Sequence, residues 1–290
     1  MKILVAIDPS SAGQTAVAQV AARPWPSDTI FEVLAVVETS YVTPAELDDW
    51  TRHATTVAEN AATELRSAGR NATPLVLNGH PKAAIVDRAK EIAANLIVVG
   101  AGNAGDIERF LLGGVASAVL RHAPCSVELV RAGALHSGGW KVLLATDGSP
   151  NSLAAAHSIA VRPWPAGTEV RILSAVELSL TLLQSTMEPP YLNSETMEVQ
   201  RVEAMKRAQD AIRSAEEILT AAGLQTSESI SVLIESPKQS ILNEAKEWGA
   251  DLVVLGSHGH RGLDRFLLGS VSEAVALHAP CSVEVIRTNL

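Results

Sequence analysis

The stretch KILVAIDPS, residues 2–10, decides the fold because it occurs twice. It returns as KVLLATDGS at residues 141–149, and the segments RFLLG and HAPCSVE recur unchanged near the end of each half. Such self-similarity is the signature of a duplicated structural unit. We therefore expect two similar domains, residues 1–131 and 140–290, joined by a small-residue linker at 132–139.

Each copy of this stretch has the composition of a short strand that ends in an aspartate and a turn. The later runs LIVVG (96–100) and LVVLG (252–256) are continuously apolar, as expected of parallel strands buried on both faces. Between such runs lie Ala-rich or amphipathic segments of helical length. The pattern predicts an α/β fold of two tandem, doubly wound, five-stranded parallel-sheet sandwiches, each with four helices.

Composition narrows the class of partner. The chain has 290 residues, 47% hydrophobic and 19% charged, with a formal net charge of -9. It has no long Lys/Arg run, which argues against nucleic acid and anionic membranes as partners. No segment approaches the roughly 18 apolar residues that span a bilayer. We expect a soluble, cytoplasmic protein whose ligand is a small molecule.

The second copy is longer than the first. The offset between the copies is 139 residues from Asp8 to Asp147, but 156 residues from Gly100 to Gly256. Seventeen extra residues must therefore fall between these points, and we expect an added loop between Glu177 and Pro237.

In doubly wound sheets, ligands bind at the carboxyl ends of the strands. In the second half, this rule selects ATDGSP (145–150) and GSHGHRGLDRFLLGS (256–270). Gly256 and Gly259 would permit a close backbone approach and positive φ. Ser270 is predicted to cap the following helix, whose free N–H groups and dipole favour a phosphate.

The spacing G-x2-G-x9-G-S in this loop resembles that of the universal stress proteins, and the likeness extends over nearly all of both halves, as in the tandem type. The resemblance implies Rossmann-like domains of the adenine-nucleotide-binding type. It also implies that the motif binds the ribose and phosphates of ATP, that Asp147 contacts the nucleoside, and that strand backbone near Ala175 faces adenine. The expected binding residues are Asp147, Ala175, Gly256, Ser257, Gly259, Gly269, Ser270, Val271 and Ser272.

The loop contains no lysine, unlike the P-loop of nucleotide hydrolases. The possible cationic neighbours of a bound phosphate are His258, His260 and Arg261, and the site offers no evident general base. We therefore expect ATP binding, with Mg²⁺ or Mn²⁺ left open as its companion, in a stress-response regulator that acts through an unknown protein partner. The alternatives are a slow ATPase and a scaffold protein that binds no nucleotide.

The first half departs from the motif. Asn103 replaces the second glycine, Gly114 replaces the serine, and Asp106 and Glu108 add negative charge. Loss of a cap hydroxyl and gain of acid should each weaken binding by about 1 kcal/mol. The nucleotide is therefore expected mainly in the second half. For Asp147, an Asx-turn that starts the next helix is the alternative role.

The last strand of each half, SVELVR (126–131) or SVEVIR (282–287), is apolar and would lie at a sheet edge. An exposed edge of this kind must be paired or covered. The resemblance implies pairing of two domains about a two-fold axis, which a tandem chain can satisfy internally as a pseudo-dimer. A homodimer of whole chains is left open.

Overall fold

The computed structural model describes residues 1–40, 43–102, 112–131, 138–177, 194–233, 236–260 and 268–288. The first half contains β1 (Lys2–Ile7), α1 (Ser11–Ala22), β2 (Ile30–Val37), α2 (Pro44–Ser67), β3 (Asn71–Asn78), α3 (Pro81–Glu91), β4 (Leu96–Gly100), α4 (Gly114–His122) and β5 (Ser126–Val130). The second half contains β6 (Lys141–Ala145), α5 (Pro150–Ala160), β7 (Glu169–Glu177), α6 (Ser194–Ala221), β8 (Gln225–Leu233), α7 (Pro237–Trp248), β9 (Leu252–Gly256), α8 (Ser270–His278) and β10 (Ser282–Ile286).

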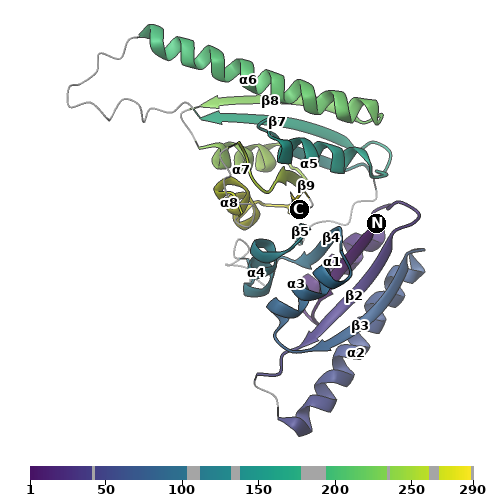
Figure 1. Ribbon diagram of the computed structural model, residues 1–290. Helices are drawn as coiled ribbons and strands as arrows, with labels where there is room; N and C mark the ends of the chain where they lie inside the picture. Colours follow the sequence, from purple (N-terminus) through teal and green to yellow (C-terminus); the bar gives the residue numbers. More distant parts are fainter. Residues whose placement is uncertain are drawn as a thin grey trace, which may run out of the picture.

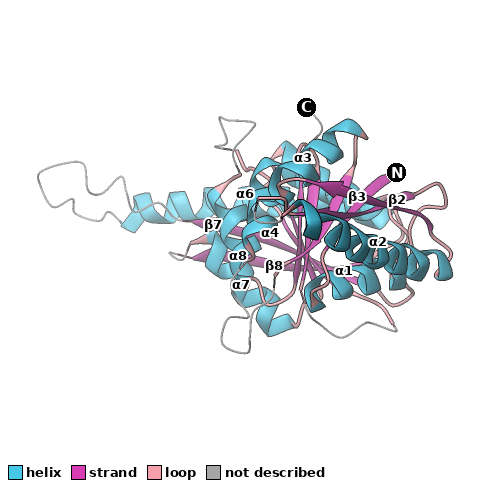
Figure 2. Cartoon of the chain, turned by 90° about the horizontal axis from the view of Figure 1, so that it is seen from below, coloured by secondary structure: helices cyan, strands magenta, loops and turns pink. Residues whose placement is uncertain are grey.

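All ten strands form one sheet with helices on both faces (Figures 1 and 2). The strand order is β3-β2-β1-β4-β5-β10-β9-β6-β7-β8. Neighbouring strands are parallel within each half. The strand order reverses between the first and fourth strands of each half, as in a doubly wound fold. The predicted fold class is confirmed.

Helix boundaries follow from local sequence. Pro81 and Pro237 occupy the first turns of α3 and α7, where the missing N–H group costs no hydrogen bond. Gly69 and Gly223 follow α2 and α6 with φ of +79° and +77°, the left-handed conformation that ends a helix. Within the residues that the structure describes, no helix is long and apolar enough to cross a membrane.

The two halves join through their last strands. β5 and β10 pair antiparallel, with Glu128 directly opposite Glu284. The two strands expected at sheet edges therefore lie at the centre of the ten-stranded sheet. The predicted pairing of the halves within one chain is confirmed.

A cluster of buried charges lies at this junction. Arg162 donates to Glu284 with both Nη atoms, one of them at 2.6 Å from Oε2, and Arg23 donates to Glu128 at 2.6 Å. All four side chains are at most 5% exposed. Burial alone would lower the pKa of Arg162, but Glu284 and then Glu128 hold it above its usual value. The two ion pairs thus act as one cluster.

Each half also caps a helix of the other. Arg131, after β5, donates to the carbonyls of Ala276 and Leu277 in the last turn of α8, at 2.7 and 3.0 Å. Arg287, after β10, donates to the carbonyls of Leu120 and Arg121 in the last turn of α4, both at 3.0 Å. A cation suits a helix C-terminus. These reciprocal contacts fix α4 and α8 to the junction.

The extra residues of the second half fall in two places. The offset between the halves rises from 139 residues at Asp147 to 154 between Gly69 and Gly223, and to 156 between Pro81 and Pro237. Fifteen extra residues therefore precede Gly223 and two follow it. α6 has 28 residues and α2 has 24. The rest of the predicted loop, residues 178–193, and most of the predicted linker, residues 132–137, lie outside the described residues.

Candidate functional site

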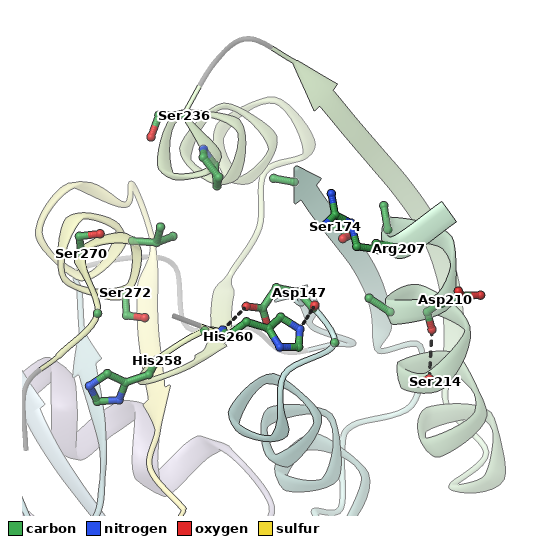
Figure 3. Close-up of a pocket in the computed structure, with 18 residues that line it drawn as sticks. Asp147, Ser174, Arg207, Asp210, Ser214, Ser236, His258, His260, Ser270 and Ser272 are labelled. Carbon is green, nitrogen blue, oxygen red and sulfur yellow. Dashed lines mark hydrogen bonds between the residues drawn. The ribbon is translucent and has the colours of Figure 1, made fainter. Parts of the chain in front are cut away.

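A cavity of about 800 Å³ opens at the carboxyl edge of the second half (Figure 3). Its walls come from the turn after β6, the end of β7, the loop after β9, the start of α8, and one face of α6. Seven of the nine predicted residues line it: Asp147, Ala175, Gly259, Gly269, Ser270, Val271 and Ser272. The two selected segments, far apart in sequence, therefore meet at one site.

The other two predicted residues lie beside this cavity. Gly256 lines a smaller adjoining cavity of about 160 Å³, whose apolar wall includes Leu173, Ile241 and Leu255. Ser257 is buried, and its hydroxyl lies 3.1 Å from Nδ1 of His258. The small cavity is an apolar slot and the large one carries most of the polar groups, a division typical of ligand sites.

Asp147 connects the two segments. Its Oδ1 accepts from the N–H of Ser149 at 3.0 Å, which is an Asx-turn at the start of α5. Its Oδ2 accepts from the N–H of His260 at 3.3 Å, and its carbonyl oxygen lies 2.9 Å from Nε2 of His260. The Asx-turn is therefore present, and the same side chain also holds the loop after β9 against the turn after β6.

The glycines of the loop are needed because other groups approach closely. A Cβ at Gly256 would lie 2.7 Å from the backbone of Asn151, and a Cβ at Gly259 would lie 2.4 Å from Oδ2 of Asp147. Neither glycine has positive φ, so that part of the prediction is wrong; the positive φ, +77°, is at Gly148 in the turn after β6. At Gly256 and Gly259 the groups that approach closely are therefore other parts of the protein, namely α5 and Asp147.

The start of α8 differs from the prediction by one residue. Gly269 is the N-cap and Ser270 is the first helical residue, with no side-chain cap. The N–H of Gly269 bonds to Ser257 O at 2.8 Å, and the carbonyl of Gly269 accepts the first hydrogen bond of the helix, from the N–H of Glu273. Gly269 therefore takes the cap position, and the predicted capping role of Ser270 is wrong. The hydroxyl of Ser270 caps no helix N–H group and has no hydrogen-bond partner among the described residues, and Ser270 lines the cavity wall. The N-terminus of α8, where N–H groups and the dipole favour an anion, borders the cavity.

Sequence reasoning missed the wall that α6 supplies. Arg207, Asp210 and Ser214 line the cavity from this helix, opposite Ser270 (Figure 3). Their spacing of three and four residues marks one helical face, but the sequence does not indicate which face turns toward the site. Arg207 is a further candidate cation at the site, in addition to His258, His260 and Arg261.

His258 does not serve as a cationic neighbour. Burial, and then the charge of Arg287, lowers the pKa of His258 below its usual value, so the ring is neutral at neutral pH. Figure 3 shows the ring turned away from Asp147. The third candidate, Arg261, lies outside the described residues.

Ser174 on β7 is another wall residue that was missed. It is 1% exposed, and its hydroxyl has no hydrogen-bond partner among the described residues. In the first half, Ala35 occupies the equivalent place at the offset of 139 residues. The second half therefore buries a hydroxyl at this wall where the first half buries a methyl group.

Replacing Ser174 with alanine is expected to leave the free energy of unfolding unchanged or to raise it by up to about 1 kcal/mol, because an unpartnered buried hydroxyl contributes no bond. Urea denaturation measures this change. The matched control is Ser152→Ala: its hydroxyl donates to Ser149 O at 2.9 Å and accepts from Thr146 at 3.1 Å, so it should cost about 1 kcal/mol. Equal losses in the two variants would show that the hydroxyl of Ser174 is bonded in solution.

The first half keeps the hydrogen bond that closes the loop, but its backbone conformation beside that bond differs. The N–H of Gly113 bonds to Ala101 O at 2.9 Å, as Gly269 does to Ser257. Gly113 is also the N-cap of α4, so a lost cap hydroxyl does not distinguish the halves, and that expectation is wrong. The backbone differs at Gly102, where φ is +109°, whereas the equivalent His258 has no positive φ. Asn103, Asp106 and Glu108 lie outside the described residues.

Asp8 has a different setting from Asp147. It accepts from the N–H of Ser10 at 3.1 Å in the same Asx-turn. It lines a cleft of about 410 Å³ between α1 and α2, together with His53 and Glu64. The equivalent aspartates thus share the turn but face cavities of different composition.

Comparisons with known proteins agree with this architecture. The model of the universal stress protein family matches residues 1–131 and, again, residues 140–287. A protein of Staphylococcus epidermidis described as a universal stress protein is 30% identical over 151 residues, which cover 51% of this chain and 83% of that protein. A Staphylococcus aureus relative is 31% identical over 149 residues, with the same two shares.

Solved structures extend the likeness to the whole chain. The crystal structure of a universal stress protein from Archaeoglobus fulgidus aligns with 99% of this chain and 96% of its own, at 20% identity and a TM-score of 0.68. A universal stress protein from Pseudomonas aeruginosa aligns with 98% of this chain and 92% of its own, at 20% identity and a TM-score of 0.63. At these identities the likeness concerns the fold, and the two family matches supply the assignment. The chain belongs to the universal stress protein family, with the family's domain present twice.

Proposed function

We propose that the second half binds ATP in the 800 Å³ cavity and that the protein is a cytoplasmic stress-response regulator without robust catalysis. The observation that carries the proposal is the convergence of seven predicted residues on this one cavity, beside the open N-terminus of α8. Family membership supports nucleotide binding in general. The choice of ATP rests on the motif of the second half.

The residues present fit this ligand. The apolar slot beside Leu173, Ile241 and Leu255 suits a flat base. The uncapped N–H groups and hydroxyl of the first turn of α8 suit phosphates. Asp147 lies between these two regions and lines both cavities, which is the place of a group that contacts the nucleoside. The cavity therefore offers complementary surroundings to each part of ATP.

The geometry favours binding over turnover. Hydrolysis needs a group that positions or deprotonates water. Both carboxylate oxygens of Asp147 already accept backbone hydrogen bonds, and the ring of His258 is turned away from Asp147 (Figure 3). We propose that occupancy of the site is read by a protein partner. A slow ATPase and a scaffold that binds no nucleotide are the competing functions.

The purified protein should release an adenine nucleotide on gentle denaturation, and the stripped protein should bind ATP with a stoichiometry near one. Calorimetry with and without Mg²⁺ or Mn²⁺ measures this, and phosphate release is followed in the same sample. A stoichiometry near two would show that the first half also binds. Steady phosphate release would favour the ATPase, and absence of binding would leave the scaffold.

A further inference from the structure

The helix proposed to bind phosphate carries an acid in its first turn. Glu273 is the fourth residue of α8, three positions after Ser270. A glutamate at this position stabilises the helix through a favourable interaction with the helix dipole. Its negative charge also repels a polyphosphate bound at the same helix end. One helical turn is about 5.4 Å, within the roughly 8 Å over which charges interact at physiological salt. Left unpaired, Glu273 would weaken the binding that this helix end provides.

The counterion of Glu273 comes from the other half of the chain. Arg121, in the last turn of α4, donates Nε to Oε1 of Glu273 at 2.7 Å, and its Nη2 lies 2.7 Å from the same oxygen. The pair links α4 to α8 across the junction, and Figure 1 shows that these two helices are neighbours there. Arg121 therefore neutralises the acid without contacting the cavity.

This pair breaks the symmetry of the junction. At the offset of 156 residues, Arg121 corresponds to Leu277 and Glu273 corresponds to Ser117. A leucine and a serine form no ion pair, so the equivalent contact cannot exist at the start of α4. By contrast, the caps made by Arg131 and Arg287 are reciprocal. The added charge pair serves the one helix that follows the intact motif.

We infer that the first half completes the phosphate site of the second half by supplying Arg121 as the counterion of Glu273. The inference rests on the proposed binding of ATP. Arg121 is a positioning residue: it acts through Glu273 and keeps the N-terminal end of α8 attractive to anions. The degenerate first half thus has a function in binding although it lacks the motif.

The test compares Arg121→Leu, Glu273→Ser and the double variant, which install the residues of the opposite half. Calorimetry with ATP and adenosine is run at low and high salt. Arg121→Leu should weaken ATP binding roughly fivefold, less at high salt, and should leave adenosine binding unchanged. The double variant should restore ATP affinity to within about twofold of the unmodified protein, because it removes the unpaired acid as well.

The control is Arg66→Leu, which removes one exposed arginine from an ion pair with Glu59 on α2 and changes the net charge equally. It should retain ATP affinity. If Arg121→Leu binds ATP as tightly as the unmodified protein, or loses adenosine to the same degree, or is not rescued in the double variant, the inference is wrong while the proposed function stands. If the unmodified protein binds neither adenosine nor ATP, the inference and the proposed function fail together.

Discussion

Replacing Glu284 with alanine is expected to lower the free energy of unfolding by about 3–5 kcal/mol. The substitution leaves the guanidinium of Arg162 buried without its carboxylate, and a buried charge without a partner carries a large desolvation cost. It also removes one of the two glutamates that face each other where β5 meets β10. Denaturant unfolding followed by circular dichroism measures the loss.

Two comparison variants isolate the cause. Glu198→Ala breaks an exposed ion pair with Arg201 and should leave the free energy of unfolding nearly unchanged, because solvent screens exposed pairs. Replacing both Arg162 and Glu284 with apolar residues, as Arg162→Met and Glu284→Leu, should recover much of the loss, because no charge is left unpaired. A cost for Glu284→Ala no larger than that for Glu198→Ala would show that the cluster does not stabilise the junction.

Replacing Gly259 with alanine should raise the Kd for ATP roughly tenfold or more, from an overpacking cost of about 1–3 kcal/mol. The new Cβ would lie 2.4 Å from Oδ2 of Asp147, so the carboxylate or the loop must move. Either movement breaks the hydrogen bond from His260 that holds the two binding segments together. Calorimetry with ATP gives the change in affinity.

Gly138 supplies the matched control, because a Cβ there meets nothing within 4 Å and the residue lies outside the cavity. Gly138→Ala should bind ATP as the unmodified protein does. Melting temperatures of both variants report whether the fold is intact. Unchanged ATP affinity in a folded Gly259→Ala variant would mean that the contact with Asp147 does not shape the site.

The sequence predicted the fold well because the relevant signals are local and occur twice. Continuous apolar runs marked the parallel strands, and residue types that favour helix boundaries stand where helices begin or end in the structure: Pro81, Pro237, Gly69 and Gly223. The strand order follows from the doubly wound class, which leaves few arrangements for five strands and four helices. The apolar edges of β5 and β10 required that these strands be paired or covered, and the resemblance to the universal stress proteins implied that they pair with each other.

The candidate site was predicted only in part, for physical reasons. Motif spacing identified the loop, but the helix begins one residue earlier than expected because the N–H of Gly269 bonds to Ser257 O. The α6 wall with Arg207 depends on which face of a helix packs inward, and this is set by tertiary contacts. The contact between Arg121 and Glu273 depends on the position of the axis between the halves, which no spacing within either half contains.

The antiparallel pairing of β5 with β10 has a consequence for how such a protein can evolve. In a dimer of identical chains, every substitution at the axis appears on both sides, so a new arginine on one helix also appears on its symmetry mate. Fusion of the two domains into one chain removes that restriction. One copy can keep the ligand motif while the other loses it and changes instead to support its neighbour, and the ratio of the two stays fixed at one to one by the covalent connection.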